Sequence, residues 1–212
     1  MITAEQAATF IRCMSVGGVA VFPADTVYGL ACAPDEGAAV RRMYAMKGRP
    51  PDKPAAVMFF AVGAALAALP ELGPRTREVL PGLLPGGVTL LLPNPAGRFP
   101  LAGVPDAPTP ALGLRVPALT DATVALAEAR WPILQTSANH AGGPDARRLV
   151  DVPPDIRAEA DLLLDAGTLP GTPSTVVDLQ RFEDDGHWAI VRSGAVDEAV
   201  VRTVLGPPGP DS

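Results

Sequence analysis

The chain has 212 residues, of which 48% are hydrophobic and only 19% charged, and its formal net charge is −6. This length suits one sizeable core and is short for two, so we expect a single domain over residues 1–206 and a flexible C-terminal tail over residues 207–212. The acidic balance disfavours a protein whose main task is to bind nucleic-acid phosphates, because such proteins usually carry a basic face.

The sequence lacks the usual signs of a membrane protein, a secreted protein or a zinc protein. No apolar run approaches the roughly 18 residues of a membrane span, and the N-terminal segment has no signal-peptide pattern. Cys13 and Cys32 lie outside any CxxC pair, and His140 and His187 add no zinc spacing. We therefore expect a cytoplasmic protein with two free thiols, no metal site and no membrane contact.

The predicted elements begin with a helix. Thr3 followed by Gln6 fits a capping box, apolar residues recur at helical spacing as far as Met14, and Gly17 ends the element. A second helix starts near residue 35 and stops at Gly48. Short apolar stretches rich in β-branched residues predict strands at 19–22, 55–60, 88–92, 111–116, 132–136, 161–165, 174–179 and 187–192. Further helices are predicted at 62–69, 74–80, 120–130 and 196–205.

Helices and strands alternate irregularly along the chain, which predicts an α/β (α+β) fold with a mixed sheet and helices on its faces. Strands 174–179 and 187–192 are expected to be neighbours joined by the polar loop QRFEDDG. The Pro-rich segment 99–110 is expected to form a long surface loop.

The two lysines of the chain both lie in the segment KGRPPDK, residues 47–53. Lys47, Arg49 and Lys53 would place three cations close together on a stretch stiffened by prolines, which favours a phosphate site. Alternatively, the cations only complement the carbonyl end of a helix, an effect worth about 0.3–1 kcal/mol each. The common glycine-rich nucleotide loops, GxxxxGK[ST] and GxGxxG, do not occur.

Other polar segments next to predicted strands hold further candidate side chains. Ser137 and Asn139 in QTSANHAGG, and Ser174 in GTPSTVVDL, could bind a ligand or could close turns through their own backbone. The same two interpretations apply to Thr26 in ADTVYGL. Arg115 in GLRVP differs, because a buried guanidinium needs an anionic partner, either a structural carboxylate or a substrate. No arrangement typical of a Ser/His/Asp or Cys/His nucleophile is evident.

Seven segments, taken in order, resemble the YrdC/TsaC family of threonylcarbamoyl-AMP synthases. They are PADTVYGL, KGRPPDKPAAV, PGGVTLLLP, GLRVP, TSANHAGGP, GTPSTVVDL and IVRSGAV, and the resemblance as a whole covers about residues 5–205. The resemblance is to the short, single-domain form, and it implies an open, twisted, mixed sheet with a concave ligand-binding face. It also implies synthesis of threonylcarbamoyl-AMP and pyrophosphate from L-threonine, bicarbonate and ATP with Mg²⁺. That product serves the modification of a tRNA adenosine next to the anticodon.

The resemblance further implies roles for individual residues. The family's Lys-x-Arg and Ser-x-Asn signature, expected to hold the ATP phosphates and the reacting centre, is matched by Lys47, Arg49, Ser137 and Asn139. The positions expected to contact ATP are Arg49, Lys53, Ser137, Asp145 and Arg192. The positions expected to contact threonine are Thr26, Met58, Arg115, Gln135 and Ser174. The sequence departs from common family residues at Met58, Ala111 and Asp145, and an aspartate near the phosphates would repel ATP.

Two other functions fit part of this pattern. A carbamoyl-adenylate-forming enzyme, as found in a domain of hydrogenase-maturation proteins, would use carbamoyl phosphate, but those chains carry acylphosphatase and zinc-binding parts. A non-catalytic paralogue that binds double-stranded RNA should have more cationic surface. For the synthase, the resemblance implies a separate tRNA threonylcarbamoyl-transferase complex as the downstream partner. It leaves weak direct binding of tRNA or double-stranded RNA open.

Overall fold

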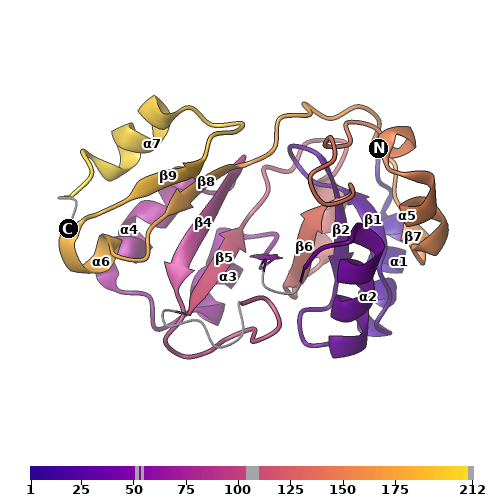
Figure 1. Ribbon diagram of the computed structural model, residues 1–212, viewed down its shortest axis with the longest axis horizontal. Helices are drawn as coiled ribbons and strands as arrows, with labels where there is room; N and C mark the ends of the chain where they lie inside the picture. The colour runs from indigo at the N-terminus through magenta and orange to yellow at the C-terminus, as the bar shows by residue number, and fades with distance from the viewer. Residues whose placement is uncertain (51–52, 54, 104–109, 210–212) are drawn as a thin grey trace.

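The computed structural model describes residues 1–50, 53, 55–103 and 110–209. Within these residues, nine strands form one mixed sheet in the order β7-β1-β2-β6-β3-β5-β4-β8-β9 (Figure 1). The strands are β1 (Ala20–Pro23), β2 (Tyr28–Cys32), β3 (Ala56–Met58), β4 (Val88–Pro93), β5 (Ala111–Arg115), β6 (Ile133–Ser137), β7 (Leu162–Leu163), β8 (Thr175–Asp178) and β9 (Ala189–Arg192). The mixed α/β sheet expected from the sequence is confirmed.

The helices lie around this sheet, with α1, α2 and α5 near its β1-β2-β7 end and α6 and α7 near its β8-β9 end (Figure 1). The α-helices are α1 (Ala4–Ser15), α2 (Gly37–Lys47), α3 (Val62–Ala68), α4 (Pro74–Leu83), α5 (Pro154–Glu159), α6 (Phe182–Asp185) and α7 (Glu198–Leu205). Two 3-10 helices, η1 (Val124–Glu128) and η2 (Leu149–Asp151), complete the described elements. No helix within the described ranges is both long and apolar enough to span a membrane.

The predicted capping box at the start of α1 is confirmed. The backbone N–H of Gln6 donates to Thr3 Oγ1 over 3.2 Å, and the backbone N–H of Thr3 donates to Gln6 Oε1 over 3.0 Å. Gly48 ends α2 in the left-handed conformation, with φ of 61°, as the sequence predicted. Strands β8 and β9 are antiparallel neighbours, which was also expected.

Removing the cap of α1 gives a test of how much this local motif stabilises the fold. Thr3→Ala should lower the free energy of unfolding by about 1 kcal/mol, because the backbone N–H of Gln6 at the helix start loses the hydroxyl that accepts from it. Urea denaturation would measure the change, and Thr3→Ser, which keeps the hydroxyl, should stay close to the wild type. Equal losses in both variants would contradict a capping role.

Several local predictions were wrong. Residues 28–32 form β2 and continue the polar segment ADTVYGL into a hairpin, in which the N–H of Ala24 donates to the carbonyl of Val27 over 3.3 Å. The helix predicted at 120–130 is only the 3-10 helix η1, because Thr123 Oγ1 accepts from the backbone N–H of Thr120 and competes with helical pairing. The loop predicted between β8 and β9 contains the short helix α6.

Some expectations fall partly outside the described residues. These are the tail over 207–212, the loop over 99–110 and the proline-rich part of KGRPPDK, for which residues 210–212, 104–109, and 51, 52 and 54 are not described. The described end of the tail is attached to the domain, since the N–H of Gly209 donates to the carbonyl of Gly186 over 3.1 Å.

Alternation along the strands gives the sheet two different faces. Side chains such as Val57, Leu90 and Leu114 belong to the larger apolar cluster, together with residues of α2, α3 and α4. The opposite face is covered at one end by a smaller cluster, in which Phe10 of α1 packs against Phe22 with ring centroids 5.5 Å apart. The rest of this second face holds a pocket.

Candidate active site

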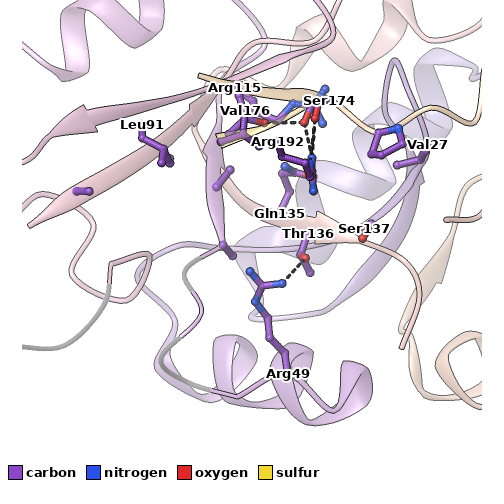
Figure 2. Close-up of a pocket in the computed structure, with 16 residues that line it drawn as sticks. Val27, Arg49, Leu91, Arg115, Gln135, Thr136, Ser137, Ser174, Val176 and Arg192 are labelled. Atoms are coloured by element: carbon purple, nitrogen blue, oxygen red, sulfur yellow. Dashed lines mark hydrogen bonds between the residues drawn. The ribbon is translucent and has the colours of Figure 1, made fainter. Parts of the chain in front are cut away.

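A pocket of about 280 Å³ lies on the second face of the sheet, over β3, β4, β5 and β6 (Figure 2). Its floor is hollow because small residues occupy the centre of the sheet. A Cβ atom at Gly113 would lie only 3.3 Å from Ala56 Cα on the neighbouring strand. The pocket is lined by Val27, Arg49, Ala55, Ala56, Thr89, Leu91, Ala111, Gly113, Arg115, Gln135, Thr136, Ser137, Pro173, Ser174, Val176 and Arg192.

The pocket is electropositive although the whole chain is acidic. Three guanidinium groups line it, from Arg49 after α2, Arg115 at the end of β5 and Arg192 at the end of β9. Arg49 enters from one side, whereas Arg192 and Ser174 lie on the other (Figure 2). Among the described lining residues there is no Asp or Glu side chain. A water-accessible cavity with this charge favours an anionic ligand.

Arg115 has the buried carboxylate partner that its place in an apolar strand required. Its Nη2 donates to Asp25 Oδ1 over 2.6 Å, and the two side chains are only 4% and 5% exposed. Burial lowers the pKa of Arg115, and the charge of Asp25 opposes that shift. The second carboxylate oxygen, Asp25 Oδ2, accepts from the backbone N–H of Ala118 over 3.2 Å. Asp25 therefore fixes the position of the guanidinium at the pocket wall.

One donor of this buried arginine remains without a partner. Arg115 Nε and Thr26 Oγ1 are the two buried side-chain atoms in the described part of the chain that make no hydrogen bond. Leaving such a group unpaired costs about 1–3 kcal/mol. Arg115 lines the pocket and Thr26 directly precedes the lining residue Val27, so both unsatisfied groups lie in segments that border the pocket.

Ser174 lies on the side of the pocket away from Arg49 (Figure 2), where two neighbours fix it. Its hydroxyl lies 2.7 Å from Thr89 Oγ1, and Arg192 Nη2 donates to the Ser174 carbonyl over 2.7 Å and to its hydroxyl over 3.2 Å. Thr89 was missed by the sequence analysis. Its signal was a hydroxyl residue inside the apolar run VTLLL, at a strand position that alternation directs to the pocket face.

Arg49 and Lys47 differ in where they place their charges. Arg49 lines the pocket, where its Nη1 donates to Thr136 Oγ1 over 3.3 Å and its Nε donates to the Lys53 carbonyl over 2.9 Å. Lys47 is only 3% exposed and does not line the pocket. Its Nζ lies behind the strand end, within hydrogen-bond distance of four oxygens of Ser137 and Asn139.

The burial of Lys47 has a consequence for pH-dependent stability. Burial, and secondarily the charge of Arg49, lower the pKa of Lys47 to about 8, while Asp145 acts in the opposite direction. A lysine in the unfolded chain keeps its proton up to about pH 10.4. Between about pH 8 and pH 10.4 the unfolded state therefore binds more protons at Lys47 than the folded state does. The contribution of Lys47 to the free energy of unfolding accordingly becomes more favourable as pH rises.

We therefore expect the free energy of unfolding of the wild type to rise relative to that of Lys47→Met as the pH increases from about 8 to about 10.4. The destabilising effect of charging Lys47 is fully present below this window and disappears above it. Urea denaturation of both proteins at a series of pH values would measure the difference, which cancels the titration of other groups. A difference that does not change with pH would contradict the lowered pKa.

The structure brings together half of the residues that the sequence analysis selected. Those that line the pocket are Arg49, Arg115, Gln135, Ser137, Ser174 and Arg192. Those that do not line it are Thr26, Lys47, Lys53, Met58, Asn139 and Asp145. Met58 is fully buried in the smaller apolar cluster, opposite Ile133 on β6, so its side chain does not reach the pocket in this structure. Asn139 bonds Lys47 and the Gly143 carbonyl instead.

The described residues include no group of three or more His, Cys, Asp or Glu side chains that could hold a metal ion. Both cysteines are free, as expected, and burial raises the pKa of the Cys32 thiol to about 12. The chemistry that the pocket itself offers is therefore recognition of anions by arginines and hydrogen bonding by serine hydroxyls.

Comparisons with known proteins identify the family of the chain. The family model described as telomere recombination, Sua5/YciO/YrdC, matches residues 12–194. The chain is 31% identical over 204 residues to a threonylcarbamoyl-AMP synthase of Pyrococcus abyssi, covering 94% of this chain and 56% of that protein. A protein of the same name from Xanthomonas oryzae pv. oryzae is 34% identical over 188 residues, covering 86% of this chain and 94% of that protein.

The fold also matches a solved structure. The crystal structure of P. abyssi Sua5 complexed with L-threonine aligns with a TM-score of 0.80 and 26% identity, covering 99% of this chain and 60% of that chain. The chain thus spans little more than half of the length of its Pyrococcus relative.

Proposed function

This chain belongs to the Sua5/YciO/YrdC family, and from that membership we propose that it makes threonylcarbamoyl-AMP and pyrophosphate from L-threonine, bicarbonate and ATP. The observation that carries the proposal is the convergence of Arg49, Arg115 and Arg192 on one pocket whose described lining contains no carboxylate. ATP, bicarbonate and the threonine carboxylate are all anions, and such a pocket attracts each of them.

In the proposed reaction, the threonine amine and bicarbonate first combine to a carbamate with loss of water, and an oxygen of this carbamate then attacks the α-phosphorus of ATP. A new P–O bond forms as the bond to the pyrophosphate oxygen breaks, and pyrophosphate leaves with the electron pair. Negative charge spreads over the phosphoryl oxygens at that moment, so fixed cations such as Arg49 and Arg192 would stabilise it without reorganisation. The Mg²⁺ that accompanies ATP as part of the substrate would shield the triphosphate.

We assign threonine to the part of the pocket around Arg115 and Ser174. Arg115 is held by Asp25 and still has the unpaired Nε, while the Ser174 hydroxyl is fixed by Thr89. A carboxylate bound there would gain a charge-assisted hydrogen bond, which is stronger than a hydrogen bond between neutral groups. The relative that was crystallised with L-threonine shares this fold over nearly the whole chain, which supports the assignment.

The product would pass to a separate tRNA threonylcarbamoyl-transferase complex. A weak direct contact with tRNA or double-stranded RNA remains part of the proposal, although the net charge of −6 makes strong binding unexpected.

Pyrophosphate release by the purified protein tests the proposal. With MgATP and bicarbonate, release should require L-threonine, and mass spectrometry should detect threonylcarbamoyl-AMP. Arg49→Ala should lower the rate by about 100-fold or more, because a pocket cation is lost. The exposed Arg202 gives a matched control, since Arg202→Ala should leave the rate unchanged.

Other outcomes would favour other functions. Release with carbamoyl phosphate and no threonine would favour the carbamoyl-adenylate-forming enzyme. A folded wild-type protein that releases no pyrophosphate under any of these conditions would contradict synthase activity and favour the RNA-binding paralogue.

A further inference from the structure

Lys47 has a different role from Arg49, although the two residues form one Lys-x-Arg motif. We propose that Lys47 is a positioning residue, an internal clamp that fixes the turn after β6 from behind, and that it does not contact the ATP phosphates. This inference rests on the proposed function, because it assigns different roles in that site to Lys47 and Arg49. It reverses the role that the motif alone implied for Lys47.

The surroundings of the ammonium group carry the inference. Lys47 Nζ lies 2.7 Å from the Ser137 carbonyl, 2.8 Å from the Asn139 carbonyl, 2.5 Å from Asn139 Oδ1 and 3.2 Å from Ser137 Oγ. An ammonium group has three N–H donors, so four oxygens already exceed its capacity. With 3% of the residue exposed, no donor is left for a phosphate that enters from the pocket.

One further bond ties the same turn to the end of α2, and another holds the turn together internally. The backbone N–H of Ala141 donates to the Lys47 carbonyl over 2.9 Å, so both the main chain and the side chain of Lys47 hold this turn. Asn139 Nδ2 donates to the Gly143 carbonyl over 2.6 Å and closes the turn on itself. Small residues and glycines form much of this segment, TSANHAGG, and they would not fix its conformation by packing.

The clamp has a clear effect on the pocket. Ser137 lines the pocket, and its main-chain carbonyl is directed toward Nζ behind the strand end. A cation at that point holds two carbonyl groups and two side-chain oxygens of the turn together, and so fixes the position of Ser137 at the pocket. Lys47 thereby acts through Ser137 and Asn139, whereas Arg49 offers its charge directly to the ligand.

The decisive experiment compares Lys47→Met with Arg49→Met in two measurements. The first is hydrogen exchange of the backbone amides of residues 137–143 in the ligand-free protein, followed by mass spectrometry. The second determines two quantities separately: the dissociation constant for MgATP, by titration calorimetry, and kcat for pyrophosphate release.

For Lys47→Met we expect exchange in residues 137–143 to accelerate at least 10-fold while the amides of β4 keep their protection. We expect kcat to fall at least 100-fold and the dissociation constant for MgATP to change less than threefold. Arg49→Met should leave exchange in the turn unchanged and raise the dissociation constant for MgATP at least 10-fold, together with the loss of rate expected when this pocket cation is removed. Should Lys47→Met fail to fold, Lys47→Gln, which keeps two N–H donors, takes its place in both measurements.

The proposal would be wrong if the turn kept its protection from exchange in Lys47→Met and the dissociation constant for MgATP rose as much as in Arg49→Met. Lys47 would then be assigned to the ATP phosphates. The exchange measurement needs no turnover, so it tests the clamp even where the wild type makes no adenylate. Absence of wild-type turnover, by contrast, contradicts the proposed function and not the clamp.

Discussion

Replacing Arg115 by Met should lower the free energy of unfolding by about 3–5 kcal/mol, one of the two largest effects that we expect. The Asp25 carboxylate would lose its charged partner while remaining in a site where its side chain is only 5% exposed. Its other described contact, the backbone N–H of Ala118 at 3.2 Å, cannot replace a guanidinium. Urea denaturation at neutral pH would measure the loss.

A double variant separates the ion pair from the packing of the arginine stem. Arg115→Met with Asp25→Asn should be more stable than Arg115→Met alone, because the uncompensated charge is gone. Arg202→Met is the exposed control, since the side chains of Arg202 and Glu198 are 50% and 55% exposed, and it should cost less than about 0.5 kcal/mol. A loss below about 1 kcal/mol in Arg115→Met would mean that water reaches Asp25.

Adding one methyl group at Gly194 should inactivate the pocket. A Cβ atom there would lie 2.5 Å from the carbonyl carbon and 2.6 Å from the carbonyl oxygen of Ser174, and would also meet the Pro173 carbonyl. These are backbone atoms, so the segment that carries Ser174 must move. A displacement of about 1 Å in a binding group can cost about 100-fold in rate, and we expect that loss in kcat/KM for Gly194→Ala. The same overpacking should lower stability by about 1–3 kcal/mol.

Gly63 provides the matched control for this substitution. It lies in α3, and a Cβ atom there would meet nothing within 4 Å. Gly63→Ala should leave kcat/KM unchanged and raise stability by about 0.5–1 kcal/mol, because alanine favours a helix over glycine. Normal kcat/KM in a folded Gly194→Ala protein would show that the position of Ser174 is not critical.

The sequence predicted α1 and most of the strands but missed β2 and the short helix α6. Helix α1 has a cap, an apolar period and a glycine stop, which are local signals that survive in the structure. Strand β2 contains Gly29 and Ala31, whose intrinsic strand propensity is low. It forms because β1 pairs with it on one side and β6 on the other. Pairing with a distant strand such as β6 cannot be predicted from the five residues of β2 alone.

In the candidate site, too, the sequence predicted what depends on neighbouring residues and missed what depends on distant contacts. The need of Arg115 for an anionic partner could be argued from its apolar strand, but the choice of Asp25 depends on a contact across 90 residues. Likewise, the position of Lys47 at a helix end was predictable. The direction of its side chain, behind the strand end and away from the pocket, depends on where β6 stops relative to α2.

The burial of Lys47 also decides how the protein responds to amine-reactive reagents. Of the two lysines, only Lys53 is exposed, so it is the lysine that such reagents would modify. The Lys53 carbonyl is bonded to Arg49 at the pocket, which places this lysine beside the ligand entrance. Amine coupling to a sensor chip would therefore attach part of the molecules through Lys53, next to the ligand-binding pocket. Affinities recorded on such a surface would be lower than those in solution, whereas attachment through an added C-terminal tag avoids Lys53.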